Sequence, residues 1–288
     1  MRQYALCLII MLFMLGCAAN QKNADTNEPL TEEEIIAEQQ RQEMLAMQKS
    51  WWVPSPGIGW HYQLNTFLQT YDDAHVYDID LFDTPQETID ELHTEGKRVI
   101  CYFSAGTYES NREDMRNISQ ELLGESLEDF PDERWIDIRD GSLQQLMLTR
   151  LDLAKEKRCD GVEADNVDAF ENINGLDIRY DDQLYYNRLL ANEAHKRNLS
   201  IGLKNDLEQI EELVDFFDFA INEQCFEFEE CDFLEPFTEQ SKAVFGVEYG
   251  LEPEEFCDEA NEKNLSWLVM DVELDGNRYS CKEHIAME

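Results

Sequence analysis

Positively charged residues are scarce in this chain. Its 288 residues include 23 Lys and Arg but 63 Asp and Glu, which gives a formal net charge of −40 at pH 7. Nucleic-acid binding requires a basic surface that neutralises phosphates, so a nucleic-acid partner is not expected. A polycationic partner would be attracted to this chain, although surface acidity by itself more often serves solubility.

Several common motifs are also missing. No glycine-rich dinucleotide fingerprint follows the first strand-like run, and no phosphate loop occurs, which argues against a nucleotide-dependent oxidoreductase. Paired CxxC motifs and closely spaced histidines are absent, so no pattern indicates a zinc site. We therefore expect neither a metal nor an organic cofactor.

The N-terminal segment is typical of an export signal. The apolar run Leu6–Leu15 is too short to span a bilayer as a stable helix. It ends in Gly16-Cys17, as bacterial lipoprotein signals do, so we expect residues 1–16 to be removed and Cys17 to carry a lipid. The alternative is an ordinary secretory signal cleaved near Ala18.

Either signal exports the protein, and the lipoprotein signal would anchor it to a bacterial membrane at the cell envelope or surface. Residues 17–50 are first polar and then helix-favouring, which predicts a tether. Residues 51–288 suit one large α/β domain, and we expect a monomer.

Export permits disulfides. Six cysteines remain after Cys7 and Cys17 are set aside, and six allow 15 connectivities. The short separation makes Cys225–Cys231 the easiest pair, and Cys257–Cys281 would staple the C-terminal segment. Cys101 and Cys159 lie in apolar runs, where they either pair or stay buried as thiols.

Apolar runs alternate with amphipathic segments from residue 60 onward. The predicted strands are Trp60–Leu64, Val76–Leu81, Val99–Ser104, Trp135–Ile138, Gly161–Asp165, Ser200–Lys204, Phe217–Asn222, Ala243–Glu248 and Trp267–Asp271. The predicted helices include Thr84–Glu95, Leu143–Lys157, Asp182–Arg197 and Pro253–Lys263. This alternation predicts a (β/α)8 TIM-type barrel with one additional strand, and the short Trp135–Ile138 is the candidate for the strand outside the barrel.

Polar side chains gather where the predicted strands end. The carboxyl ends of barrel strands meet at one rim, so Asp165 and Glu223 would face each other across a cleft. Hydrolysis of a glycosidic bond needs such a pair, one acid for the leaving oxygen and one carboxylate for the anomeric carbon. Alternate strand residues share a direction, so Glu163 would lie deeper than Asp165 and pair with Lys204.

Two stretches have alternative interpretations. Asp165-Asn166-Val167-Asp168 could bind calcium, but it lacks the glycine and the distal glutamate of an EF-hand loop, so we favour catalysis. Asp78, Asp80 and Asp83 serve either as caps and turns before a helix at Thr84 or as substrate ligands, and the sequence does not separate these roles.

The chain resembles the endo-α-1,4-polygalactosaminidases, glycoside hydrolase family 114. The resemblance lies in WHYQL (60–64), YDIDLFD (77–83), VICYFSAGTYE (99–109), ERWIDIR (133–139), RLDLAKEKRCDGVEADNVD (150–168), GLKN (202–205), residues 217–231 and KAVFGVEY (242–249). It implies a (β/α)8 barrel with an additional strand and a retaining mechanism. Asp165 would be the nucleophile and Glu223 the general acid/base, and Ala164 replaces the proline expected before Asp165.

The resemblance also implies a cationic substrate, a polysaccharide of α-1,4-linked galactosamine. The expected substrate-binding residues are Asp78, Asp80, Asp83, Tyr102, Ser104, Glu109, Asn166, Asp168, Lys204, Asn205, Asn222, Glu248 and Tyr249. Of these, Asp78, Asp80, Asp83 and Glu109 would hold the ammonium groups. The competing hypotheses are a non-catalytic surface lipoprotein that binds cationic polysaccharide and a metal-assisted deacetylase.

Overall fold

The computed structural model describes residues 50–284 except 66 and 129. The predicted signal peptide, the lipid-bearing Cys17 and the tether lie outside these residues. Within the described part, no helix is both long and apolar enough to cross a membrane.

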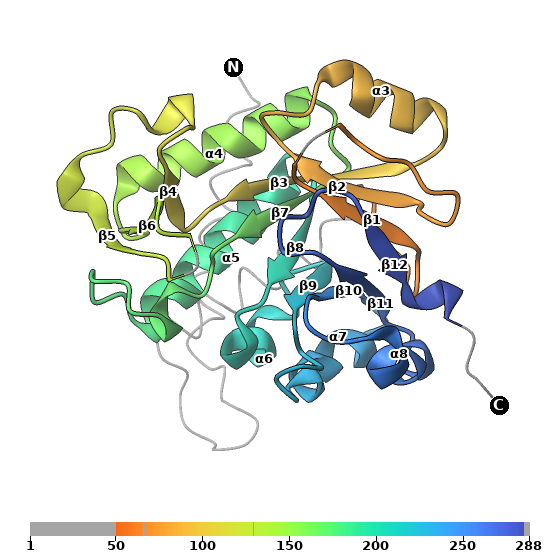
Figure 1. Ribbon diagram of the computed structural model, residues 1–288. Coiled ribbons are helices and arrows are strands. Elements are labelled where there is room, and N and C mark those ends of the chain that lie inside the picture. The colour runs from red at the N-terminus through yellow and green to blue at the C-terminus, as the bar shows by residue number, and fades with distance from the viewer. Residues whose placement is uncertain (1–49, 66, 129, 285–288) are drawn as a thin grey trace, which may run out of the picture. The chain divides into compact units, whose positions relative to one another are not determined.

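The main sheet is a nearly closed barrel of parallel strands with helices around it (Figure 1). Within the described residues its parallel strands are β1 (Trp60–Gln63), β2 (Val76–Asp80), β3 (Arg98–Ser104), β7 (Gly161–Asp165), β8 (Ser200–Lys204), β9 (Phe219–Glu223), β10 (Ala243–Glu248) and β11 (Ser266–Met270). They pair in chain order from β1 to β11. The predicted (β/α)8 architecture is confirmed.

The main sheet also has a strand that the sequence did not predict. A short strand, β12 (Arg278–Ser280), pairs antiparallel with β11 and extends the main sheet. Trp135–Ile138 overlaps β6 (Glu133–Ile136), which lies outside the barrel, as expected. It forms a separate antiparallel sheet with β4 (Thr107–Glu109) and β5 (Leu123–Ser126), inserted between β3 and β7.

Helices follow most of the parallel strands. They are α3 (Gln86–Thr94), α4 (Gly141–Glu156), α5 (Tyr180–Lys196), α6 (Ile210–Leu213), α7 (Glu235–Glu239) and α8 (Pro253–Glu262). The four predicted helices correspond to α3, α4, α5 and α8, whereas the short α6 and α7 were not predicted. Asp140 caps α4 by accepting a hydrogen bond of 2.9 Å from the Ser142 amide, which fixes where this helix begins.

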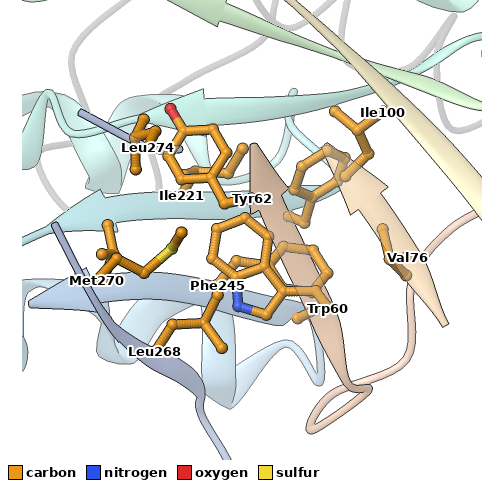
Figure 2. Close-up of a cluster of buried hydrophobic side chains, with 12 residues drawn as sticks. Trp60, Tyr62, Val76, Ile100, Ile221, Phe245, Leu268, Met270 and Leu274 are labelled. Atoms are coloured by element: carbon orange, nitrogen blue, oxygen red, sulfur yellow. The ribbon is translucent and has the colours of Figure 1, made fainter. Parts of the chain in front are cut away.

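The barrel interior is packed with large apolar side chains. Trp60, Tyr62 and Phe245 form its centre, and Leu268 and Met270 close it from β11 (Figure 2). Burying a side chain of this size contributes roughly 1.5–3 kcal/mol relative to exposure. Trp60, Trp135 and Trp267 are all buried. This interior holds the strands rigidly, so residues at the strand ends have fixed positions.

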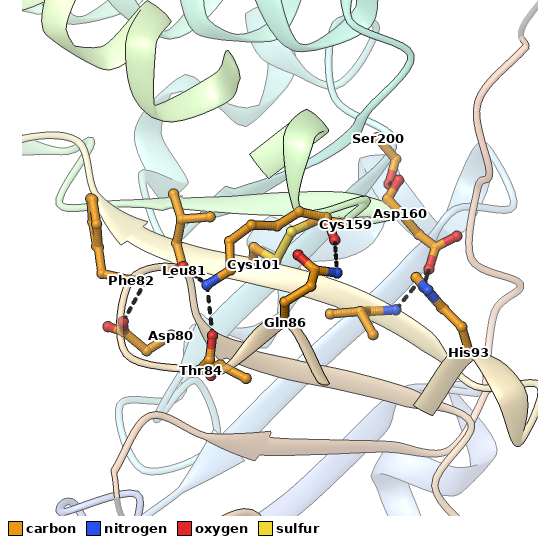
Figure 3. The surroundings of a disulfide bond; sticks show 12 residues. Asp80, Leu81, Phe82, Thr84, Gln86, His93, Cys101, Cys159, Asp160 and Ser200 are labelled. Carbon is orange, nitrogen blue, oxygen red and sulfur yellow. Dashed lines mark hydrogen bonds and ion pairs between the residues drawn. A yellow bond between two sulfur atoms is a disulfide. The ribbon is translucent and has the colours of Figure 1, made fainter. Parts of the chain in front are cut away.

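Three disulfides reinforce the barrel. They join Cys101 to Cys159, Cys225 to Cys231 and Cys257 to Cys281. The sequence left the pairing of Cys101 and Cys159 open. This disulfide links β3 to the segment just before β7. The neighbouring residue Asp160 lies 2.9 Å from the His93 side chain (Figure 3). The disulfide therefore ties together two neighbouring strands that both carry rim residues.

Candidate active site

Three charged side chains stand at the ends of three adjacent strands. Asp165 is the last residue of β7, Lys204 of β8 and Glu223 of β9. These strands are parallel neighbours, and their order places Lys204 between the two carboxylates (Figure 1). The two acidic residues that are 58 positions apart in sequence therefore meet at one rim.

The ammonium group of Lys204 joins this site together. Its Nζ atom lies 3.1 Å from Asp165 Oδ1 and 3.2 Å from Glu223 Oε2. The sum of these two distances is an upper limit on the separation of the two oxygens. A third carboxylate, Glu163, lies 3.3 Å from the ammonium, so three acidic side chains surround one positive charge.

Asp165 is held in a fixed orientation by uncharged donors. The Tyr102 hydroxyl donates to its Oδ2 at 3.0 Å, and the Asn166 amide nitrogen donates to its Oδ1 at 2.7 Å. The Asn166 side chain also donates to Oδ2 at 3.3 Å and to Ser104 Oγ at 3.0 Å. Asn166 has a φ of 60°, a left-handed conformation that Asn tolerates better than most residues.

Glu223 is also positioned on both sides. The Tyr249 hydroxyl donates to its Oε1 atom, while its backbone N–H donates to Asn205 Oδ1 at 3.0 Å. The Asn222 side chain donates to the same Asn205 oxygen at 3.2 Å. The side chain of Glu223 is 26% exposed and that of Asp165 is 16% exposed, so both carboxylates are partly accessible to solvent.

Two buried carboxyl groups form the floor of the site. Glu163 is fully buried and accepts a hydrogen bond of 3.1 Å from the Tyr62 hydroxyl. Burial raises the pKa of Glu163 to about 7, and burial together with the charge of Glu163 raises the pKa of Asp78 well above its usual range. Burial and the nearby charge of Glu163 therefore both favour the neutral form of the Asp78 carboxyl group. The prediction that Glu163 lies deeper and pairs with Lys204 is confirmed.

Asp80 and Glu109 have structural partners rather than open positions. Arg112 donates to Asp80 Oδ2 at 2.5 Å and to Glu109 Oε1 at 2.9 Å, and all three side chains are nearly buried. Asp80 also accepts from two backbone N–H groups of the turn that follows it, as the capping interpretation predicted. The exposed Asp83 shares the same guanidinium at 3.1 Å. Asp80 and Glu109 are thus buried and held by Arg112, so we correct the expectation that these two residues hold ammonium groups. For the exposed Asp83 this role stays a prediction.

We also correct the assignment of Asp78 and Glu248 as substrate-binding residues. Asp78 is fully buried in the floor of the site, beneath Asp165 and Glu223. Glu248 is also fully buried and accepts hydrogen bonds from the backbone of Phe226 at 3.0 Å and from the Trp267 indole at 3.2 Å. Glu248 therefore supports the loop after β9 and does not reach a substrate.

Sequence reasoning missed one rim residue, Glu133. It is the first residue of β6, and the inserted sheet carries it to the site. Thr107 donates to Glu133 Oε2 at 2.7 Å, and the Thr107 hydroxyl lies 2.5 Å from Ser104 Oγ, which in turn accepts from Asn166. A chain of hydrogen bonds thus connects Glu133 to the amide that orients Asp165. The ERWIDIR stretch contained this glutamate, but nothing local indicated where an inserted strand would place it.

A parallel barrel with two carboxylates meeting at its C-terminal rim is the arrangement of a glycoside hydrolase. The sequence pattern of glycoside hydrolase family GH114 matches residues 41–286. The chain therefore belongs to family GH114, and it is a glycosidase.

Solved structures agree with this assignment. The crystal structure of Aspergillus fumigatus Ega3 in complex with galactosamine is 39% identical in sequence and has a TM-score of 0.77, with 80% of this chain and 97% of that chain covered. The glycoside hydrolase domain of PelA from Pseudomonas aeruginosa is 14% identical with a TM-score of 0.61, covering 77% of this chain and 97% of that chain, and supports the fold alone. A search of curated proteins gave no match.

Gly106 provides a test of how closely the position of Asp165 controls activity. The Ala105 N–H donates to the Asp165 carbonyl at 2.8 Å, and a Cβ atom at Gly106 would lie 1.7 Å from the Asn166 carbonyl oxygen. Gly106→Ala must therefore displace the carbonyl group of Asn166, the residue that follows Asp165 and donates to its carboxylate. We expect kcat to fall at least about tenfold, since a displacement near 1 Å can cost about 100-fold.

The matched control is Gly141→Ala, because nothing lies within 4 Å of the Cβ atom added there. Hydrolysis rates and melting curves of both variants would be compared with the wild type. A folded Gly106→Ala protein with wild-type kcat would show that activity does not depend on the close approach of this loop to Asp165 and Asn166.

Proposed function

We propose that this protein is a retaining glycosidase that cleaves α-1,4-linked galactosamine polymers, with Asp165 as nucleophile and Glu223 as general acid/base. The observation that carries the proposal is the single ammonium group within 3.1 Å of one carboxylate and 3.2 Å of the other. The two oxygens that contact this ammonium are therefore less than about 6.5 Å apart. In inverting glycosidases the two carboxyl groups are separated by at least about that distance, so the shorter separation supports a double displacement.

The first step breaks the glycosidic bond. Glu223 donates its proton to the leaving oxygen while an oxygen of Asp165 attacks the anomeric carbon and forms a glycosyl ester. Hydrogen bonds from Tyr102 and Asn166 fix the orientation of Asp165, and a hydrogen bond from Tyr249 fixes the orientation of Glu223. In the second step the Glu223 carboxylate takes a proton from water, and the water oxygen replaces Asp165 at the anomeric carbon.

Two carboxylates beside Asp165 suit an amino sugar. Among the described residues, neither Glu133 nor Asp168 has an ion pair with a Lys, Arg or His side chain. Burial, with the nearby charge of Asp165 contributing, raises the pKa of each to about 7. The amino group of galactosamine is on the carbon next to the anomeric centre, so it would lie close to the nucleophile. We propose that Glu133 and Asp168 bind this ammonium.

Two further points support the proposed substrate. The Aspergillus relative was solved in complex with galactosamine at 39% sequence identity. The chain also carries a net charge of −40, which attracts a polycation over distances of about one Debye length. The competing hypothesis of a non-catalytic binder needs the acidic surface but gives no reason for an ammonium group shared between Asp165 and Glu223.

We also propose that Cys17 carries a lipid after removal of residues 1–16 and that residues 17–50 tether a monomeric domain to the bacterial cell envelope. The support is the Leu6–Leu15 run that ends in Gly16-Cys17. A lipid with more than one acyl chain would anchor stably, whereas one chain binds only marginally.

The first prediction of this proposal concerns turnover. The wild type should shorten a deacetylated α-1,4-galactosamine polymer, and Asp165→Asn and Glu223→Gln should each lower the rate about 10²- to 10⁴-fold. Product sizes measured by mass spectrometry would check this. If the wild type leaves the polymer unchanged but binds it, the binder hypothesis is correct instead.

The second prediction concerns the ammonium. Glu133→Gln should raise KM several-fold for unacetylated oligomers and leave KM for their N-acetylated counterparts nearly unchanged. Because the carboxylate ionises as pH rises through about 7, wild-type KM should fall over this range, and the variant should lose part of that fall. Glu125→Gln is the control, since Glu125 is an exposed carboxylate on the same inserted sheet. Equal effects on both oligomers would contradict a role in amine recognition.

The third prediction concerns the anchor. Cys17→Ala should move the protein from the membrane fraction to the soluble exported fraction, and Cys7→Ala should not. Fractionation with an antibody against the barrel domain measures this. Retention of the Cys17→Ala protein in the membrane fraction would rule out the lipid as the anchor.

A further inference from the structure

We infer that Lys204 is the fixed counter-charge of the reaction, which neutralises Asp165 before bond cleavage and Glu223 after it. This inference rests on the proposed retaining mechanism and adds a role for a residue that the sequence placed among the substrate ligands. It begins with the geometry of the ammonium group, which stands almost equally far from the two carboxylates, at 3.1 and 3.2 Å.

The ammonium group of Lys204 is surrounded by the enzyme's own carboxylates. It donates to Asp165 Oδ1 at 3.1 Å and lies 3.3 Å from Glu163 and 3.2 Å from Glu223, and its side chain is only 3% exposed. Among the described residues it is also the one cation that forms an ion pair with either catalytic carboxylate. Its charge therefore acts on the enzyme's own carboxylates, and we correct its assignment from substrate ligand to positioning residue.

The two halves of the reaction exchange one negative charge between these carboxylates. Before cleavage Asp165 is ionised and Glu223 holds a proton. When the glycosyl ester forms, Asp165 becomes neutral, and Glu223 becomes ionised because its proton leaves with the departing sugar. Each state has one negative charge beside the same ammonium. Because the two distances are nearly equal, the ammonium stabilises that charge to a similar degree in both states. Neither state is therefore much lower in free energy than the other.

Glu163, in the floor of the site, keeps the ammonium group in place when the negative charge passes from Asp165 to Glu223. Glu163 lies 3.3 Å below it and is itself held by the Tyr62 hydroxyl at 3.1 Å. Burial and the nearby charge of Glu163 favour the neutral form of Asp78 beside it. Glu163 thus holds Lys204 from the barrel interior, at a fixed position between the two rim carboxylates.

Several other titratable groups face the ammonium, and a pH experiment must account for them. They are Tyr62 from β1, Asp78 from β2, Tyr102 from β3, Glu163 and Asp165 from β7, Asp168 from the loop after β7, Glu223 from β9 and Tyr249 after β10. Burial opposes the charge of Lys204, but the carboxylates, Asp165 and Glu223 foremost, outweigh burial and raise its pKa. The lysine therefore stays charged over the whole range in which activity would be measured.

The test is the pH dependence of kcat in Lys204→Met. The ammonium favours the ionised form of both catalytic carboxylates, so its removal makes both easier to protonate. The acid limb and the alkaline limb of the pH–rate profile should both move to higher pH by about one unit or more. At the wild-type optimum, kcat should fall about 10²- to 10³-fold.

Two variants separate this role from support of the fold. Lys204→Arg keeps the charge, so its limbs should stay in place while kcat decreases, and this variant remains informative if Lys204→Met does not fold. Lys157→Met removes a lysine that donates to the Leu81 and Thr84 carbonyls at 2.6 Å, away from the catalytic pair, and should lower stability without moving either limb.

A decrease of kcat in Lys204→Met with both limbs unmoved would overturn the inference, and so would a shift of the limbs in Lys204→Arg. Failure of the proposed function is distinguishable, because in that case the wild type itself would not hydrolyse the galactosamine polymer.

Discussion

The ammonium group of Lys204 satisfies three carboxylates at once, and the rest of the site is built around this interaction. Glu163, Asp165 and Glu223 could not be brought so close at the ends of neighbouring strands without a cation among them, because like charges in a poorly solvated site repel strongly. The position of the lysine depends in turn on the pairing of β7, β8 and β9 and on the packed barrel interior beneath them.

The acidic residues of the rim fall into two groups with different physical roles. Asp80 and Glu109 are compensated by Arg112, and Glu248 by backbone and indole N–H groups, so they hold loops in place. Glu133 and Asp168 have no such cation among the described residues, and burial makes their charge costly until a cation arrives. This division lets one acidic rim both stabilise the fold and, in the proposed function, bind a cationic substrate.

The sequence was most informative where a property is local. Strand alternation and the side-chain period of two predicted the barrel, the rim and the depth of Glu163, since each follows from neighbouring residues. It was least informative where distant segments meet. Arg112 reaches Asp80 from 32 positions away, β12 has only three residues and no apolar run, and Glu133 depends on how an inserted sheet folds over the rim. No local pattern in the sequence indicates these contacts.

The central claim is that Asp165 and Glu223 are close enough to act in succession on one anomeric carbon. Proton NMR of the first sugar released from an α-1,4-galactosamine oligomer tests this most directly, since two displacements keep the configuration and one inverts it. The account predicts that the α-anomer forms first and then equilibrates with the β-anomer. Initial formation of the β-anomer would contradict it.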